Sequence, residues 1–259
     1  MDYIAAERFF KDYLNDYDLS NGSIVFKIKH TFEVVRLIEY IARGLDLSDE
    51  DIELAKIIAL LHDLGRFEQI KVNGIFDNSK LEHAQYGVEV LFERGLIRKF
   101  ISDGKYDRII EKAIYNHNKY EIEKGLSERE LLFAQMIRDA DKLDVYRVYL
   151  ETEFKDLFVQ FYDPKRSIGD ESINPVILED FMNHRCARIT DRKNIIDCFV
   201  CAMAFIYDLN FDISLQYVYN NNIIDKMIDR IGKVNDGTRV QIDNIKECGN
   251  DYVKNKLGI

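Results

Sequence analysis

Proline and tryptophan are almost absent from this sequence. The 259 residues include only two prolines, Pro164 and Pro175, and no tryptophan. Because proline breaks the interior of a helix, this scarcity favours a chain that is helical along most of its length. We therefore predict an all-α fold, in which the 15 tyrosines and 16 phenylalanines supply bulky core material.

An excess of positive charge is absent as well. The 36 lysines and arginines are outnumbered by 46 aspartates and glutamates, which gives a formal net charge of −10. Nucleic acid attracts surfaces of the opposite sign, so we expect no general nucleic-acid-binding surface. A small basic pocket for a nucleotide is compatible with this charge.

Long apolar segments are missing too. No run of about 18 apolar residues occurs, so we expect no membrane span. The first residues, Met1-Asp2-Tyr3-Ile4, are not basic, and the apolar segment of a signal peptide does not follow them. These absences lead us to expect a cytoplasmic protein.

Cysteine is sparse, and its one motif is weak. Cys198 and Cys201 have the CxxC spacing that zinc sites and redox motifs use. They lie within an apolar helical segment and no second CxxC pair accompanies them. We therefore predict buried structural thiols in a reducing compartment.

The spacing of apolar residues predicts a helix in most parts of the chain. A helix over 24–43 places His30 on its apolar face. Ser48 caps a helix that runs to Asp63, and Gly65 suits the position after that helix. Residues 66–80 are predicted to form a loop.

A long helix is predicted from the capping box of Ser127 and Glu130, and it carries the acidic segment 139–144. The other predicted helices cover residues 2–18, 82–94, 106–118, 173–188, 192–209 and 212–232.

The dipeptide His62-Asp63 is the most informative feature of the chain. It closes an apolar helix, where an imidazole and a carboxylate can turn toward one point in a cleft, as metal ligands do. Aspartate at a helix C-terminus also opposes the helix dipole, which favours a cation nearby.

Further candidate ligands lie elsewhere in the first 150 residues. Each histidine has an ordinary alternative: a core histidine for His30, a first-turn residue for His83 and a polar helix end for His117. Together with an acidic cluster from Asp139 to Asp144, they form a set of histidine and aspartate only. Such a set suits divalent iron, manganese, cobalt, nickel or zinc, and an open coordination position would allow water to attack a phosphoryl group.

The order His30, His62-Asp63, Asp141 resembles the H…HD…D pattern of the HD superfamily of metal-dependent phosphohydrolases. In that family the last aspartate lies in an Ala-Asp-Arg/Lys-Leu context on a long helix. Ala140-Asp141-Lys142-Leu143 fits this context, and Asp139 is the second choice. The resemblance covers roughly residues 25–150.

The resemblance implies a first metal ion held by His30, His62, Asp63 and Asp141. His83 and His117 resemble the two additional histidines of some HD subgroups, which make extra contacts to metal or phosphate. They would either bind a second ion, to which Asp63 would bridge, or contact the substrate phosphate beside a single ion. Such subgroups include bis-adenosyl polyphosphate hydrolases and cyclic dinucleotide phosphodiesterases. The chain lacks the Gly-Tyr-Pro motif of the second subgroup, and the pattern of alarmone hydrolases is missing around His30.

The implied function is hydrolysis of a phosphate ester or anhydride through a metal-activated hydroxide. The substrate would be a nucleotide or related small phosphorylated metabolite, and the cofactor one or two ions of iron, manganese, nickel, cobalt or zinc. Arg66 and Lys142 would orient and neutralise the phosphate, with solvent exposure of Arg66 and pairing of Lys142 with Asp139 as alternatives. Lys80 and Lys119 have weaker claims.

Two other functions fit the same ligands. One is an HD-type oxygenase or lyase with two metal ions, and the other is a non-catalytic, metal-bound regulatory protein. The substrate, the native metal and the oligomeric state are not encoded in any pattern that we recognise.

For the organisation of the chain, we expect a single helical domain over residues 1–259. It would consist of an HD core at about 24–150 and a helical C-terminal extension at about 151–259. A junction is plausible at 163–169, but this segment is too short to establish a boundary.

Overall fold

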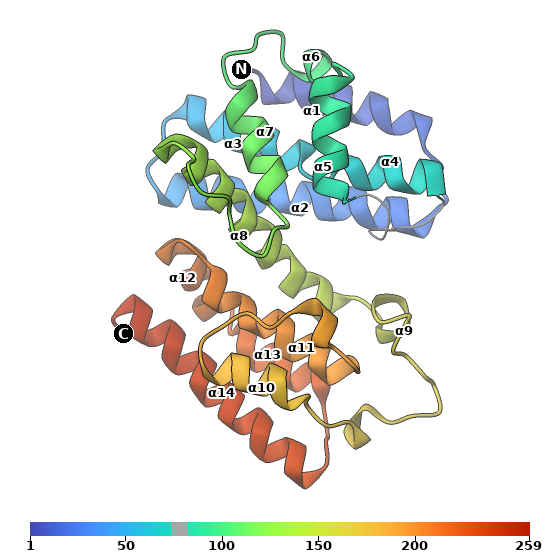
Figure 1. Cartoon of the computed structure of the whole chain (residues 1–259), viewed down its shortest axis with the longest axis vertical. Helices are drawn as coiled ribbons and strands as arrows, with labels where there is room; N and C mark the ends of the chain where they lie inside the picture. Colours follow the sequence, from blue (N-terminus) through green and yellow to red (C-terminus); the bar gives the residue numbers. More distant parts are fainter. Residues whose placement is uncertain (74–81) are drawn as a thin grey trace. The chain divides into compact units, whose positions relative to one another are not determined.

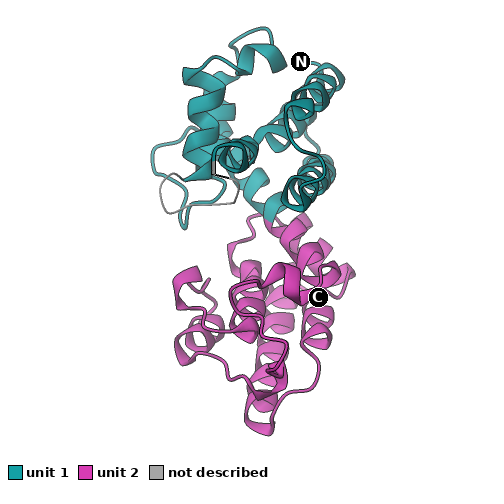
Figure 2. Ribbon diagram, turned by 90° about the vertical axis from the view of Figure 1, so that its right-hand side faces the viewer, with its two compact units in different colours: residues 1–141 teal, residues 142–259 magenta. Residues whose placement is uncertain are grey.

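The computed structural model describes residues 1–73 and 82–259, and these residues form helices without a strand (Figure 1). The predicted all-α class is therefore confirmed. The chain divides into two compact units, Met1–Asp141 and Lys142–Ile259 (Figure 2). The boundary falls within helix α8 (Glu128–Glu151). The expected division into a core and an extension concerns folding domains, and it stays a prediction.

Unit 1 contains the helices on which the candidate ligands lie. Helix α2 packs along α3, α4 packs on α5, and α5 in turn packs on α7. The helices of this unit are α1 (Tyr3–Tyr13), α2 (Gly22–Gly44), α3 (Asp49–Leu61), α4 (Leu64–Asn73), α5 (His83–Val88), α6 (Ile97–Phe100), α7 (Asp107–Asn116) and the first part of α8.

Two predicted helix starts are formed by the expected caps. The Ser48 hydroxyl accepts a hydrogen bond from the Asp51 amide at 3.2 Å, which opens α3. At α8, the Ser127 amide donates to the Glu130 carboxylate at 2.8 Å, and the Glu130 amide donates to the Ser127 hydroxyl at 3.3 Å. This reciprocal pair is a complete capping box.

The predicted loop over 66–80 is wrong in its first half. Helix α4 occupies Leu64–Asn73, because Leu64, Phe67 and Ile70 recur at helical spacing and are buried. The rest of that prediction, Lys80 included, lies outside the described residues.

Gly65 does not end α3 as predicted; it lies in the first turn of α4. A Cβ atom on Gly65 would lie 2.0 Å from the backbone oxygen of His83 and 2.7 Å from the backbone nitrogen of Gly87. The missing side chain therefore lets α4 and α5 approach each other closely.

Unit 2 departs from prediction at several points. The helix predicted over 173–188 ends at Met182, and the one predicted over 192–209 is α-helical only over Ile195–Met203. The helix predicted over 212–232 is two helices, because Asn222 adopts a left-handed conformation with φ of 51°. Helix α14 was not predicted, since only a narrow stripe that includes Ile242, Ile245 and Val253 is buried. The helices of this unit are α9 (Phe154–Leu157), α10 (Pro175–Met182), α11 (Ile195–Met203), α12 (Asp212–Asn220), α13 (Ile223–Ile231) and α14 (Asp236–Leu257).

The cysteine pair on α11 agrees with prediction. Cys198 and Cys201 are buried, and burial raises the pKa of these thiols to about 11 and about 12. Protonated, buried thiols of this kind are structural. In the described part of the chain, no helix combines the length and apolarity needed to span a bilayer.

Candidate metal centre

The predicted ligands converge inside unit 1, although they come from separate parts of the sequence. All of them are buried except Asp141, whose side chain is 24% exposed. They are His30 on α2, His62 and Asp63 in the turn after α3, His83 at the start of α5, His117 directly after α7, and Asp141 on α8.

Local sequence explains why these side chains point inward. His30 shares a face of α2 with Val34 and Leu37, which are buried, so packing of that face on α3 carries the imidazole into the interior. His62 and Asp63 occupy the tight turn between two largely buried helices, α3 and α4, and are themselves buried.

Helix α4 changes the expected interaction of Asp63 with a helix dipole. Asp63 follows α3, but it also directly precedes α4, where an acidic side chain is favourable. The case for a cation therefore depends on the surrounding donors and not on the dipole.

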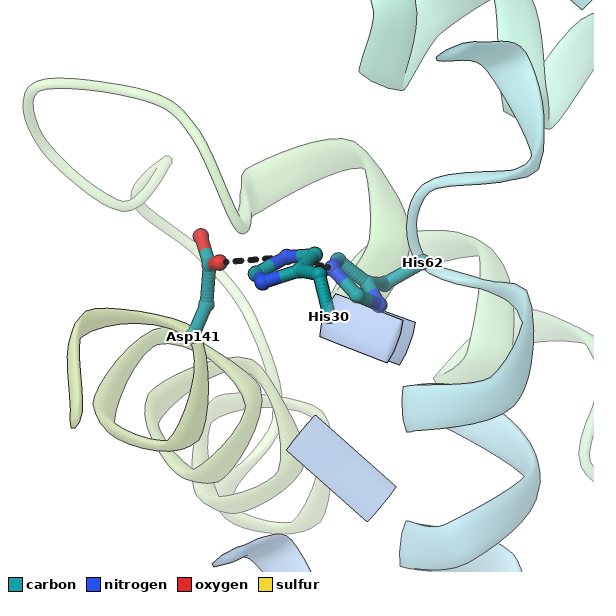
Figure 3. A group of neighbouring side chains, drawn as sticks. All are labelled: His30, His62 and Asp141. Atoms are coloured by element: carbon teal, nitrogen blue, oxygen red, sulfur yellow. Dashed lines mark hydrogen bonds and ion pairs between the residues drawn. The ribbon is translucent and has the colours of Figure 1, made fainter. Parts of the chain in front are cut away.

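One group of donors surrounds His30. Figure 3 shows the His30 imidazole between the side chains of Asp141 and His62. The His30 Nε2 atom lies 3.2 Å from Asp141 Oδ1 and 3.3 Å from His62 Nε2. Asp63 Oδ2 lies 3.4 Å from His30 Nε2 and 3.5 Å from His62 Nε2. Four possible ligand atoms from four residues thus lie close together.

A second group lies on the other oxygen of Asp63. Its Oδ1 atom is 3.5 Å from His83 Nε2 and 3.8 Å from His117 Nε2, and these two nitrogens are 3.0 Å apart. The Asp63 carboxylate thus faces a different histidine pair with each of its oxygens.

Backbone carbonyls fix the tautomer of two histidines. His62 Nδ1 donates to the Ala59 carbonyl at 2.7 Å, and His117 Nδ1 donates to the Ile114 carbonyl at 2.6 Å. Because a carbonyl only accepts, the proton resides on Nδ1 and the Nε2 lone pair faces the cluster. This is the arrangement that metal-binding histidines adopt.

His62, His83 and His117 are neutral at physiological pH. Burial lowers the pKa of His62 to about 4 and that of His83 to about 2, and it lowers the pKa of His117 as well. An imidazole binds a metal only in its neutral form.

The carboxylates are ionised. Burial acts to raise the pKa of Asp63, but the Lys27 charge and a hydrogen bond from His30 outweigh it, and the pKa falls well below its usual range. In Asp141, too, burial is opposed by a hydrogen bond from His30 and by the neighbouring histidines, which lower its pKa. Neutral nitrogen and ionised oxygen donors fit a divalent transition metal.

Within the described residues, two sets of three side chains lie close enough together to bind a metal ion. In each, the possible ligand atoms all lie within 4.8 Å of one another. The sets are His30 with His62 and Asp141, and His62 with Asp63 and His117. Their assignment as ligands stays a prediction.

The acidic residues of the segment 139–144 on α8 have different partners. Asp141 faces His30, whereas Asp144 accepts two hydrogen bonds from Arg147, at 2.6 and 2.9 Å. Asp139, the second choice for the ligand, is fully buried. The geometry thus favours Asp141 as the α8 donor.

Arg66 lies within the electrostatic field of the cluster. Its Nη1 atom donates to Gln69 Oε1 at 3.1 Å. Burial lowers the pKa of the guanidinium, while the charges of Asp63, Asp141 and Glu82 act to raise it. A guanidinium stays charged under these conditions.

The predicted lysines have other partners. Lys142 lies 2.8 Å from Asp208 Oδ2 and 5.7 Å from the centre of the Phe205 ring, so it pairs with Asp208 and not, as one alternative held, with Asp139. Lys119 pairs with Glu82 and lies over the Tyr115 ring. A phosphate contact by Lys142 would require it to leave Asp208.

Lys27 belongs to the cluster but was missed in the sequence. Its Nζ atom lies 2.5 Å from Asp63 Oδ2. The signal was available, because Lys27 precedes His30 by three residues and therefore shares its helix face.

Asn118 was also missed, although it directly follows His117. Its amide nitrogen lies 3.3 Å from His83 Nδ1, and its buried oxygen has no hydrogen-bond partner among the described residues. Turning this amide over would place the oxygen opposite His83 Nδ1, which could then donate to it. His83 Nε2 would then carry the lone pair of a ligand atom.

A family model for the HD domain matches residues 28–146. This range includes every candidate ligand. No curated protein and no solved structure matches the chain.

Proposed function

Because residues 28–146 are an HD domain, the chain is a member of the HD superfamily, and we propose that it hydrolyses phosphate esters or anhydrides with divalent metal. The superfamily consists mostly of metal-dependent hydrolases. The observation that carries the proposal is the position of Asp63, whose two oxygens face two separate histidine pairs. That arrangement suits a bridging carboxylate in a site for two ions.

The residues would act as follows. His30, His62, Asp63 and Asp141 would hold the first ion, and His83 and His117 would hold a second on the far side of Asp63. When bound, the metal would lower the pKa of a water molecule and polarise the phosphoryl oxygens. Binding would displace the proton that His30 shares with the carboxylates.

Substrate would approach from the side of Asp141, the most exposed of the candidate ligands. Arg66 would orient the phosphate through charge-assisted hydrogen bonds, as its planar guanidinium can contact two oxygens together. Since the chain carries a net charge of −10, an anionic substrate needs such a local positive group. We propose a nucleotide or similar small phosphorylated metabolite as the substrate class.

A panel of phosphorylated compounds tests this proposal. The purified chain, loaded with Mn or Fe, is incubated with mono- and dinucleotides, cyclic nucleotides and sugar phosphates, and released phosphate or product is measured. We expect turnover of at least one class, and loss of both metal and turnover in Asp63→Asn.

Asp49→Asn is the matched control, because Asp49 is an exposed carboxylate at the start of α3. It should keep metal and activity. Metal binding without hydrolysis across the panel would contradict the proposal and favour a regulatory or oxidative role.

A further inference from the structure

Lys27 is the cation nearest to the proposed bridging carboxylate. Its Nζ atom lies 2.5 Å from Asp63 Oδ2, and its side chain is 15% exposed. The same oxygen lies 3.4 Å from His30 Nε2 and 3.5 Å from His62 Nε2. The ammonium therefore occupies the side of Asp63 that faces the first group of donors.

We propose that Lys27 competes with the first metal ion for Asp63 Oδ2 and, once displaced by the ion, binds the substrate phosphate. This inference rests on the proposed function, since it deepens the account of that same site. It makes Lys27 an internal counterion in one state and a substrate-binding residue in the other.

Competition follows from the charges. The Asp63 side chain is 3% exposed, and a carboxylate buried to that degree needs a cationic partner. A lysine ammonium and a divalent ion both fill this need, but two cations on one buried oxygen repel each other strongly. In the proposed competition, an ion that binds Asp63 Oδ2 therefore moves Lys27 away from that oxygen.

The flexible stem of Lys27 determines where it goes. Its backbone stays fixed on α2, one turn before His30, so the ammonium remains within reach of the cluster. A substrate phosphate at the ion would lie within this reach and would attract the displaced ammonium. Lysine serves as a mobile point charge for phosphate in this way.

Titration with Mn in the absence of substrate tests the competition. Lys27→Met removes the ammonium and keeps the stem, and Lys27→Gln retains a neutral donor for Asp63. We expect both variants to bind Mn more tightly than the wild type, by about tenfold or more. Without metal they should unfold at a lower temperature, and Mn should abolish that difference.

Lys29→Met is the matched control, because it removes the same charge from an exposed position on the same helix. Its Mn affinity should equal that of the wild type. Inorganic phosphate is then titrated into the Mn-loaded proteins, and both Lys27 variants should bind it about tenfold more weakly.

These measurements test the competition, the phosphate contact and the proposed function separately. Unchanged or weaker Mn affinity in both Lys27 variants would overturn the competition, and wild-type phosphate affinity would overturn the transfer to phosphate. If Lys27→Met does not fold, Lys27→Gln alone decides. Absence of hydrolysis by the wild type would instead contradict the proposed function, while the substrate-free Mn titration would still report on the competition.

Discussion

Asp63 is the residue on which the proposed chemistry depends. Its Oδ2 atom faces His30 and His62, and its Oδ1 atom faces His83 and His117. Asp63 is the carboxylate nearest to His83 and His117, whereas His30 also has Asp141 as an anionic partner. We therefore expect the two histidine pairs to have different tasks, which substitutions can separate.

The second histidine pair can be removed without touching the first donors. The double variant His83→Ala/His117→Ala should retain an ion at His30, His62 and Asp141 but lose turnover by about 10–100-fold, because the second ion is lost. Metal analysis and hydrolysis assays check both parts. His184→Asn, at a left-handed position in unit 2 that Asn tolerates, is the control. Normal hydrolysis by the double variant would make these histidines structural.

Arg66 offers a prediction about substrate binding. Arg66→Ala should lower kcat/KM by about 10–100-fold, because charge-assisted hydrogen bonds worth roughly 1.5–3 kcal/mol are lost. Arg66→Lys should recover only part of the activity, since lysine lacks the planar fork. The control is Arg36→Ala, whose side chain is 58% exposed on α2. Unchanged steady-state kinetics in Arg66→Ala would remove Arg66 from the site.

Asn118 tests the inferred orientation of His83. Asn118→Ala should weaken binding of the second ion by about tenfold, because His83 Nδ1 loses its acceptor. Asn118→Asp keeps an acceptor oxygen and should retain the affinity. Equal second-site affinities in the alanine and wild-type proteins, measured by calorimetry, would contradict this role.

The sequence predicted some residues of this cluster better than others. Order and context were enough to select His62, Asp63 and Asp141, because a sequence motif records which residue types occur and in which order. Lys27 and Asn118 belong to no such motif. Helical spacing places Lys27 on the same helix face as His30, but the contacts with Asp63 and His83 depend on how the helices pack, which the sequence does not reveal.

Among the helices, the α4–α5 contact has the most direct effect on the site. Helix α5 begins at His83, and Gly65 of α4 lies against the backbone of that residue. The contact was not predicted, because the Asn-Gly pair at 73–74 indicated a turn and residues 66–80 were expected to form a loop. Caps at Ser48 and Ser127 were predictable, since they depend on neighbouring residues alone.

Gly65→Ala should therefore disturb the metal site, although Gly65 is not one of the candidate ligands. Alanine favours a helix by about 1 kcal/mol over glycine, but here its Cβ would overlap the His83 carbonyl and push α5 away. We expect a net destabilisation of about 1–3 kcal/mol and loss of the second ion. Gly22→Ala, where a Cβ meets nothing within 4 Å, is the control. A Gly65→Ala variant with wild-type melting temperature and metal content would contradict the account.

At the scale of the whole chain, the candidate site lies entirely within unit 1. The all-helical class followed from two prolines in 259 residues. The break at Asn222 and the helix α14 did not, because a left-handed residue and a narrow buried stripe leave weak signals.

The most direct test of the central claim is anomalous X-ray scattering from crystals of the Mn-loaded protein. The account predicts two Mn peaks about 3.5–4 Å apart on either side of Asp63. Their ligand distances should be about 2.0–2.3 Å to His30, His62, Asp63 and Asp141 for one ion, and to Asp63, His83 and His117 for the other. A single peak at the first group would refute the second ion, and no peak within the cluster would contradict the account as a whole.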